Sequence, residues 1–185
     1  MAKIFSMQTP QAFEDACMET FYFQAKHCAV YSEYLSLIHV NPKAVQRPGN
    51  IPFLPIECFK SHRITATSKE PQIVFSSSGT TGSVQSKHYV ADIALYEQSF
   101  RTAFEQFYGA AADTAIIALL PSYSERTGSS LIYMVDDLIR QSNHPHSGYF
   151  LHNHDELHQV LLELKDQHAK TLLIGVTYAL LDFVE

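Results

Sequence analysis

Apolar residues recur at helical spacing through the first forty positions. Thr9-Pro10 has the form of an N-cap followed by proline at the first helical position, and apolar residues then follow at intervals of three to four. A second amphipathic stretch ends before Asn41-Pro42. We therefore expect a helix over about residues 10–26, a second over 28–38, and packing of the two as a helical hairpin.

Residues 41–56 interrupt this pattern. They contain four prolines and one glycine, which a continuous helix or a sheet would not accommodate, so we expect an ordered connecting loop. Four apolar side chains of the loop are expected to lie against the core: Ile51, Phe53, Leu54 and Ile56.

From residue 72 onward, short apolar runs alternate with amphipathic stretches. The runs expected to form strands are 72–75, 114–120, 149–151 and 171–175, and the stretches expected to form helices are 93–107, 129–141 and 153–164. Alternation of strand and helix predicts an α/β fold with a mainly parallel sheet and flanking helices. We expect residues 1–50 to form the N-terminal helical hairpin with its linker, and residues 51–185 to form an α/β subdomain.

The last residues, 180–185, are still amphipathic, and no capping glycine, polar tail or turn follows them. This pattern predicts an α/β domain that is unfinished at Glu185. Because the apolar faces near its C-terminal end would then lack their cover, we also expect the chain to self-associate.

Charge and cysteine content narrow the classes of function. The 185 residues carry 13 Lys+Arg against 19 Asp+Glu, a formal net charge of −6, which argues against a general nucleic-acid partner. The three cysteines form no CxxC pair, which suits a reducing compartment. No apolar run of about 18 residues and no apolar leader segment is present. We expect a cytoplasmic protein without a membrane span.

The segment after the first expected strand concentrates hydroxyl groups and glycines, from Ser76 to Ser86, and Lys87 follows it. Glycines let backbone N–H groups converge on an anion, hydroxyls donate further hydrogen bonds, and a lysine adds positive charge. The segment therefore suits a polyphosphate. It contains no GxxxxGK[ST], GxGxxG or GxSxG pattern, which argues against a Walker A loop, a dinucleotide-binding fold and an α/β-hydrolase. A serine-rich turn without a ligand is the alternative.

Six consecutive residues, Ser77-Ser78-Gly79-Thr80-Thr81-Gly82, resemble the phosphate loop of the AMP-forming adenylate ligases. The flanking segments Ile51–Lys60 and Lys87–Val90 resemble the acyl-protein synthetase branch of that superfamily (LuxE-like, long-chain-fatty-acid luciferin-component ligase), to which phenylacetate-CoA ligase is related. The resemblance covers the chain from about residue 50 onward and implies the N-terminal part of an ANL-type N-terminal domain.

The resemblance implies activation of a carboxylic acid by ATP and transfer of the acyl group to a thiol. It implies that Ser77, Ser78, Gly79, Thr80, Thr81 and Gly82 hold the ATP phosphates, with Mg²⁺ sharing the charge. Lys87, two positions beyond the lysine of the family motif, is expected to assist. The partners implied are a small carboxylic acid, with fatty acids among the candidates, and a thiol acceptor.

The same resemblance places Tyr123, Gly128 and Gly175 on the side of the acyl substrate, and Ser124 stands where many relatives have histidine. No catalytic residue is assigned, because the ribose-binding aspartate and the lysine of the mobile domain are expected beyond Glu185. Two other functions stay open: a non-catalytic module that binds phosphate or nucleotide, and a plain phosphotransferase.

The ten histidines invite comparison with metal sites. His154 and His158 would share one helix face at a spacing that zinc accepts, but no cysteine lies near them and no HExxH pattern occurs. We expect no metal site in this cluster. For His88, beside Lys87, contact with an anion and simple packing are equally open. Arg126, in the loop after the second long strand, is expected to lie at the surface.

Overall fold

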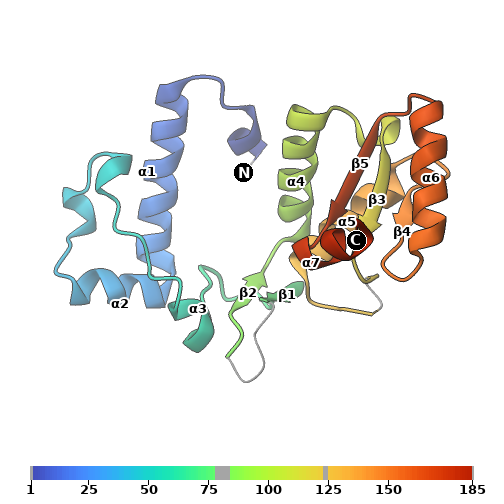
Figure 1. The fold of residues 1–185 in the computed structure, drawn as a ribbon. Helices are drawn as coiled ribbons and strands as arrows, with labels where there is room; N and C mark the ends of the chain where they lie inside the picture. The colour runs from blue at the N-terminus through green and yellow to red at the C-terminus, as the bar shows by residue number, and fades with distance from the viewer. Residues whose placement is uncertain (1, 78–83, 123–124, 185) are drawn as a thin grey trace. The chain divides into compact units, whose positions relative to one another are not determined.

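The computed structural model describes residues 2–77, 84–122 and 125–184, and the chain divides into two compact units, Met1–Ile93 and Ala94–Glu185 (Figure 1). Each unit has its own hydrophobic core. The division falls at residue 93, whereas the sequence places a boundary near residue 50. The reason is packing: Leu54, Ile64 and Ala66 all lie against the core that the N-terminal helices form.

The first unit is mainly helical and carries one β-hairpin. Its elements are η1 (Ala2–Ser6), α1 (Pro10–His27), α2 (Ala29–Leu37), η2 (Pro42–Ala44), η3 (Pro48–Asn50), α3 (Cys58–Ser61), β1 (Ile73–Ser76) and β2 (Lys87–Val90). The two expected helices are confirmed, and the Thr9 side chain accepts a hydrogen bond from the Ala12 N–H at 3.2 Å, as an N-cap does. Residues 41–56 form an irregular connection with two short 3₁₀ turns.

Helices α1 and α2 do not lie side by side as a hairpin. In Figure 1, α2 begins at the C-terminal end of α1 and turns sideways, away from the direction of α1. Cys28 alone separates the two helices, and its backbone is extended, with φ −95° and ψ 104°. An antiparallel helical hairpin needs a loop of about two to five residues to reverse the chain, so a one-residue link produces a corner instead.

The core of the first unit fills the inside of this corner. Phe21, Cys28 and Leu35 are its most deeply buried members. Two tyrosines fasten the proline-rich loop to the helices, because the Tyr22 and Tyr31 hydroxyls donate to the carbonyls of Val45 and Pro52 at 2.7 and 2.6 Å. The expected burial of that loop is confirmed only in part. Ile51 and Leu54 pack on the core, whereas Phe53 and Ile56 are exposed.

The second unit is a three-layered α/β/α arrangement. Its elements are α4 (Ile93–Tyr108, which begins one residue before the unit), η4 (Ala111–Asp113), β3 (Ala115–Leu119), α5 (Ser130–Gln141), β4 (Gly148–Tyr149), α6 (His154–Asp166), β5 (Thr171–Gly175) and α7 (Thr177–Val184). The strands form a parallel sheet in the order β4-β3-β5. The expected α/β class and parallel sheet are therefore confirmed.

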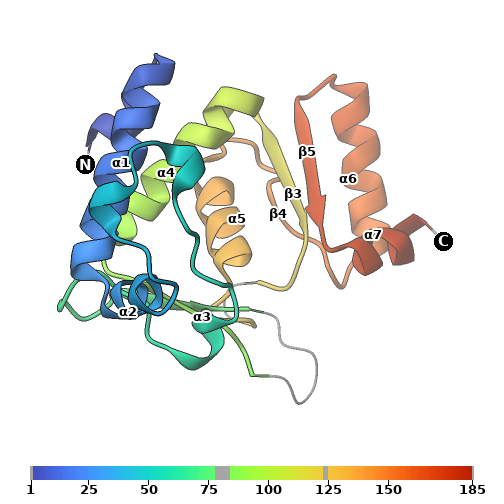
Figure 2. The same cartoon turned by 90° about the vertical axis from the view of Figure 1, so that its left-hand side faces the viewer.

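Strand β3 is the centre of this unit, because all five of its residues are buried. Its odd positions, such as Ile117, pack against α6 and α7, and its even positions, such as Ile116, pack against α4 and α5. Figure 2 shows α5 and α6 on opposite sides of the strands. A strand buried on both faces has no polar positions, which explains the unbroken apolar run in the sequence.

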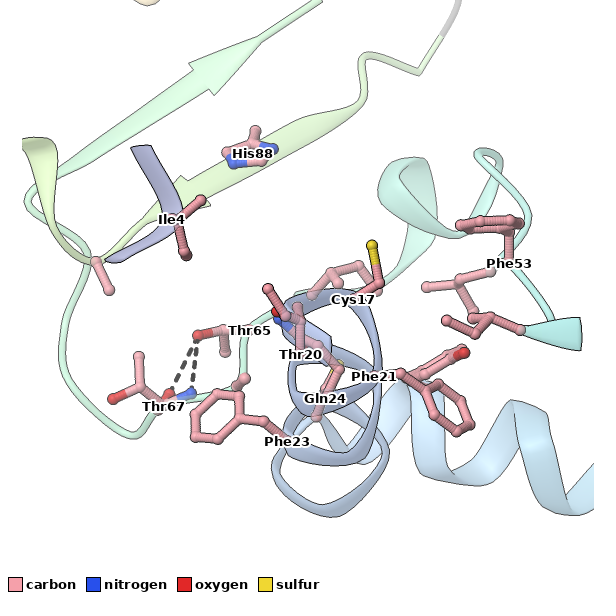
Figure 3. A pocket seen from close by; sticks show the side chains of 18 of the residues that line it. Ile4, Cys17, Thr20, Phe21, Phe23, Gln24, Phe53, Thr65, Thr67 and His88 are labelled. Carbon is pink, nitrogen blue, oxygen red and sulfur yellow. Dashed lines mark hydrogen bonds between the residues drawn. The ribbon is translucent and has the colours of Figure 1, made fainter. Parts of the chain in front are cut away.

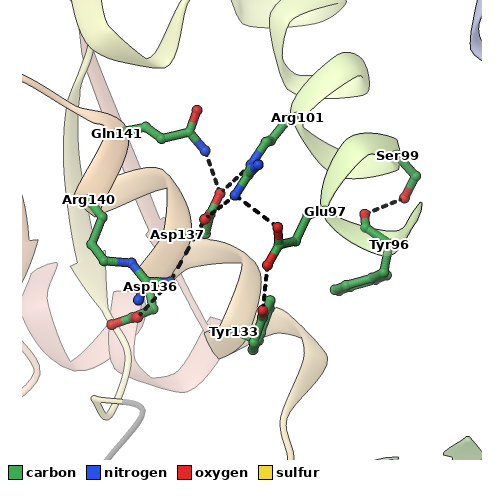
Figure 4. A network of polar contacts seen from close by, with 9 residues as sticks. All are labelled: Tyr96, Glu97, Ser99, Arg101, Tyr133, Asp136, Asp137, Arg140 and Gln141. Atoms are coloured by element: carbon green, nitrogen blue, oxygen red, sulfur yellow. Dashed lines mark hydrogen bonds and ion pairs between the residues drawn. The ribbon is translucent and has the colours of Figure 1, made fainter. Parts of the chain in front are cut away.

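An ion-pair network joins α4 to α5, the two helices that cover one face of the sheet (Figure 4). The Arg101 guanidinium donates Nε–H and Nη2–H to the two carboxylate oxygens of Asp137, at 2.8 and 2.6 Å. Gln141 also donates to Asp137, and the Tyr133 hydroxyl donates to Glu97 at 2.6 Å. Burial is the main cause that raises the pKa of Tyr133 to about 12, and the hydrogen bond to Glu97 and its negative charge add to it. This phenol therefore remains a donor at neutral pH.

Asp137 is the buried member of the network, since its side chain is 7% exposed and that of Arg101 is 42% exposed. Burial alone would raise the pKa of the Asp137 carboxyl, but the hydrogen bonds and positive charge of Arg101 outweigh burial and hold it below the ordinary value of 3.8. Folding therefore stabilises the charged form of Asp137. The contribution of this carboxylate to the free energy of unfolding is lost as the pH falls through its lowered pKa.

We predict that Asp137→Asn lowers the free energy of unfolding by about 2 kcal/mol at neutral pH, because it removes the carboxylate that accepts two hydrogen bonds from Arg101 and leaves that guanidinium, among the described residues, only its ion pair with Glu97 at 3.2 Å. Since folding favours the Asp137 carboxylate, the difference from wild type should shrink as the pH drops below 4. Urea unfolding at pH 7, 4 and 3 measures both effects. Asp136→Asn is the control, with an expected loss of about 0.5 kcal/mol, and an equal loss in the two variants would contradict the prediction.

The C-terminal part of this unit presents apolar side chains to solvent. Strand β5 is an outer strand of the sheet, and Tyr178, Leu181 and Val184 of α7 are exposed. Burial of roughly 200 Å² of such surface against a second copy would contribute about 5 kcal/mol at ~25 cal/mol per Å².

We therefore predict that the chain self-associates at high concentration and that Leu181→Lys with Val184→Lys restores a monomer, as light scattering would show. Leu37→Lys, at an exposed apolar position of the first unit, should leave association unchanged. A monomeric wild-type chain would disprove this expectation.

Candidate functional site

The glycine- and hydroxyl-rich segment joins the two strands of the β-hairpin. β1 and β2 are antiparallel, with Ser76 opposite Lys87. Beyond them the Ser77 N–H donates to the Ser86 carbonyl at 3.0 Å, and the Ser86 N–H donates to the Ser77 hydroxyl at 3.1 Å. The expected phosphate-loop residues Ser78, Gly79, Thr80, Thr81 and Gly82 lie outside the described residues, so the structure shows the neck of this loop.

The sequence predicted a strand at 72–75 and a helix at 93–107 with no strand between them, and this part of the prediction is wrong. The loop leads into the strand β2, and α4 begins only after that strand, at Ile93. The Ile93 N–H donates to the Gln72 side chain at 2.7 Å, so the start of the helix is tied to the residue before β1. Lys87-His88-Tyr89-Val90 lacks a clear apolar alternation, which is why the sequence did not indicate a strand there.

Side chains alternate between the two faces of β2. Lys87, the first residue of the strand, is exposed, and Tyr89 follows on the same face. His88 points to the opposite face, where its ring stacks on Phe59 with centroids 6.2 Å apart and an interplanar angle of 7°. Of the two interpretations open for His88, packing is the one with a contact in the structure.

The His88 face of the hairpin borders an apolar pocket of about 840 Å³ that lies within the first unit (Figure 3). Side chains of α1, among them Cys17 and Phe21, form one wall, and Phe53 and Phe59 contribute from the following segments. The exposed Phe53 that was expected in the core is thus part of this wall. The volume is in the range of small-molecule sites, which are typically apolar with few polar groups.

Few polar side chains face this pocket. Thr65 and Thr67 are bonded to one another, because the Thr65 hydroxyl donates to the Thr67 carbonyl at 3.2 Å and accepts from its N–H at 3.3 Å. Thr20 and Gln24 project from α1 (Figure 3). The arrangement can hold an apolar group and offers hydrogen bonds at a few points only. The sequence did not indicate this pocket, because its walls come from segments up to 87 residues apart that show only ordinary helical or loop patterns.

The residues expected on the acyl-substrate side belong to the second unit. Tyr123 and Ser124 lie outside the described residues. Gly128 has a φ of +81°, which favours glycine, in the loop before α5. Gly175 ends β5, and a Cβ there would lie 2.9 Å from the Leu119 Cβ. Close packing between strands thus accounts for the glycine at 175 without a substrate.

The carboxyl ends of β3 and β4 carry one polar cluster. The Glu125 carboxylate accepts hydrogen bonds from the Ser122 hydroxyl and N–H, both at 2.6 Å, and lies 3.3 Å from His152 Nε2. The Ser122 bonds, with help from His152, lower the pKa of Glu125. This carboxylate fastens the loop after β3 to the turn after β4. Open α/β sheets bind their ligands at the carboxyl ends of the strands. The cluster lies at that place in the second unit.

The histidines are dispersed among different partners. His146 lies 3.1 Å from Glu163, His152 pairs with Glu125, and the ring of His154 contacts Phe183 edge-on. Across the part of the chain that the structure describes, no group of three or more His, Cys, Asp or Glu side chains could hold a metal ion. Also among described residues, no helix combines the length and apolar character needed to cross a bilayer.

Comparison with known proteins adds no relative to this picture: no protein-family model, no curated protein and no solved structure matches the chain. The functional argument therefore depends on the residues and on the geometry described above.

We predict that the apolar pocket binds a neutral apolar dye such as Nile red, and that Cys17→Trp weakens this binding at least tenfold by filling the pocket. Fluorescence titration measures the affinity. Leu37→Trp adds the same ring at an exposed position outside the pocket and should have no effect. Undiminished binding by the Cys17 variant would show that the dye binds elsewhere.

Proposed function

We propose that this chain forms the phosphate-binding part of an AMP-forming ligase that activates a carboxylic acid. In the reaction a carboxylate oxygen attacks the α-phosphorus of ATP, and the bond from that phosphorus to the bridging oxygen breaks. Pyrophosphate leaves, and the acyl group then passes from the adenylate to a thiol with release of AMP. The observation that carries the proposal is the run Ser77–Gly82 between paired strands.

The hairpin supports a role in phosphate binding. The reciprocal hydrogen bonds of Ser77 and Ser86 fix both ends of the loop, so the loop residues lose less entropy when they order around an anion. Lys87 begins β2 directly after this neck and is exposed. Glycine N–H groups and serine and threonine hydroxyls then supply the donors for the ATP phosphates.

The apolar pocket supports an acid with an apolar tail, of which a fatty acid is one example. It borders the same hairpin, through His88 and Tyr89, and its walls offer few hydrogen bonds. An apolar chain buried there would contribute about 0.8 kcal/mol per CH₂ group. The thiol acceptor is proposed from the resemblance alone.

Mg²⁺ enters this proposal as a companion of ATP. It binds oxygen ligands and is commonly carried by substrate phosphates with one or two carboxylates. When bound, Mg²⁺ neutralises part of the phosphate charge, and the role of this chain is to position the phosphates.

We predict that the full-length protein catalyses ATP–pyrophosphate exchange that depends on a carboxylic acid, and that Gly79→Val reduces the exchange at least 100-fold. The added side chain would keep the loop backbone from approaching the phosphates. A panel of acids of increasing chain length tests the apolar preference at the same time.

The matched control for this exchange assay is Gly49→Val, because nothing lies within 4 Å of the position where that side chain would begin. Both variants should unfold at the wild-type temperature. Binding of ATP without exchange by any acid would favour the alternative of a non-catalytic nucleotide-binding module. Transfer of a phosphate from ATP to an acceptor would favour a phosphotransferase.

A further inference from the structure

A second pocket, of about 510 Å³, lies next to β2 in the first unit. Two segments line it, residues 59–63 around α3 and residues 84–89 at the base of the loop. Four of its nine lining residues are basic and none is acidic: Lys60, His62, Arg63 and Lys87. We name this pocket the basic groove.

The basic groove stands out against the charge of the whole chain. The protein has a net charge of −6 and only 13 Lys+Arg, yet three of those cations line one small pocket. Like charges held close together repel one another, and an anion between them relieves this repulsion. Such a concentration in an acidic protein therefore points to an anionic ligand.

Two of the cations come together because α3 packs against β2. Lys60 lies in α3 and Lys87 begins β2, and both are exposed. Among the described residues neither lysine makes an ion pair. Both ammonium groups can therefore turn towards a ligand in the groove.

Arg63 is held in place from two sides. Its guanidinium lies over the Tyr89 ring, 5.2 Å from the centroid, and its Nη2 is 3.2 Å from the Glu70 carboxylate. Glu70 does not line the groove and is itself highly exposed. A guanidinium fixed in this way keeps further N–H groups for a second oxyanion, and its planar fork suits phosphate.

We propose that the basic groove is a phosphate subsite in which Lys60, Arg63 and Lys87 hold one end of an oligophosphate. Three cations match an oligophosphate better than a single carboxylate. The groove also reaches the loop through Val84 and Gln85, so one ligand can contact both places. The proposal deepens the proposed function and depends on it only for the source of the ligand, which is either free pyrophosphate or the triphosphate of ATP.

The test measures binding of pyrophosphate and of ATP by calorimetry to the chain and its variants. Lys60→Gln with Arg63→Gln should weaken binding about tenfold or more, since it removes charged hydrogen-bond donors. Glu70→Gln should tighten binding roughly two- to fivefold, because it removes a competing carboxylate beside Arg63. As Glu70 is exposed, this variant keeps the test valid even where the double variant folds poorly.

The matched control for the groove is Lys26→Gln with Lys43→Gln, which removes the same charge from exposed positions of the same unit outside the groove. It should change the affinity by less than about twofold. An effect as large as that of the groove variant would overturn the proposal, and so would unchanged binding in both the groove variant and Glu70→Gln.

Gly79→Val separates the groove from the loop. Loss of binding in Gly79→Val with normal binding in the groove variant would overturn the subsite and leave the proposed function intact. The opposite pattern would support the subsite and contradict the proposed role of the loop. Weakening of ATP but not pyrophosphate binding in the groove variant identifies the nucleotide as the source, and weakening of both identifies the shared phosphates.

Discussion

The pairing of β1 with β2 is the constraint on which the candidate site depends. Because side chains alternate along β2, one short strand directs His88 to the apolar pocket and Lys87 to the basic groove. A shift of one residue in the register would exchange these two faces. The Ser77 and Ser86 hydrogen bonds continue the pairing beyond the strands and oppose such a shift. The apolar pocket and the basic groove therefore meet at this strand, and Phe59 and Tyr89 line both of them.

Much of the second unit could be predicted from the sequence, because its core obeys simple periodicity. β3 is apolar at every position since both of its faces are covered, and α6 begins at a recognisable cap, Asn153, whose side chain accepts from the Glu156 N–H. The first unit was harder to predict. The direction of α2 depends on the single residue Cys28 between the helices, and helical periodicity contains no information about such a corner.

The candidate site, too, could be predicted from the sequence only where its residues are consecutive. The loop motif could be recognised because its residues are consecutive, whereas the pocket and the groove are assembled from segments separated along the chain. Phe53 was expected in the core because it is apolar, but it is exposed and lines the apolar pocket together with side chains of α1. Lys60 and Lys87 are 27 positions apart, and only the packing of α3 on β2 brings them to one groove.

The two ends of the hairpin meet at one place. The Gln72 N–H donates to the Val90 carbonyl at 2.9 Å, and the Gln72 side chain accepts from the Ile93 N–H, so the chain enters and leaves the hairpin within hydrogen-bonding distance. Strands β1 and β2 thus begin and end at neighbouring points of the first unit, and β2 also packs against α3. In evolutionary terms, loops of different length and chemistry could be exchanged beyond the Ser77–Ser86 neck while the helical core keeps its connections. Such exchanges would then cost this protein little stability.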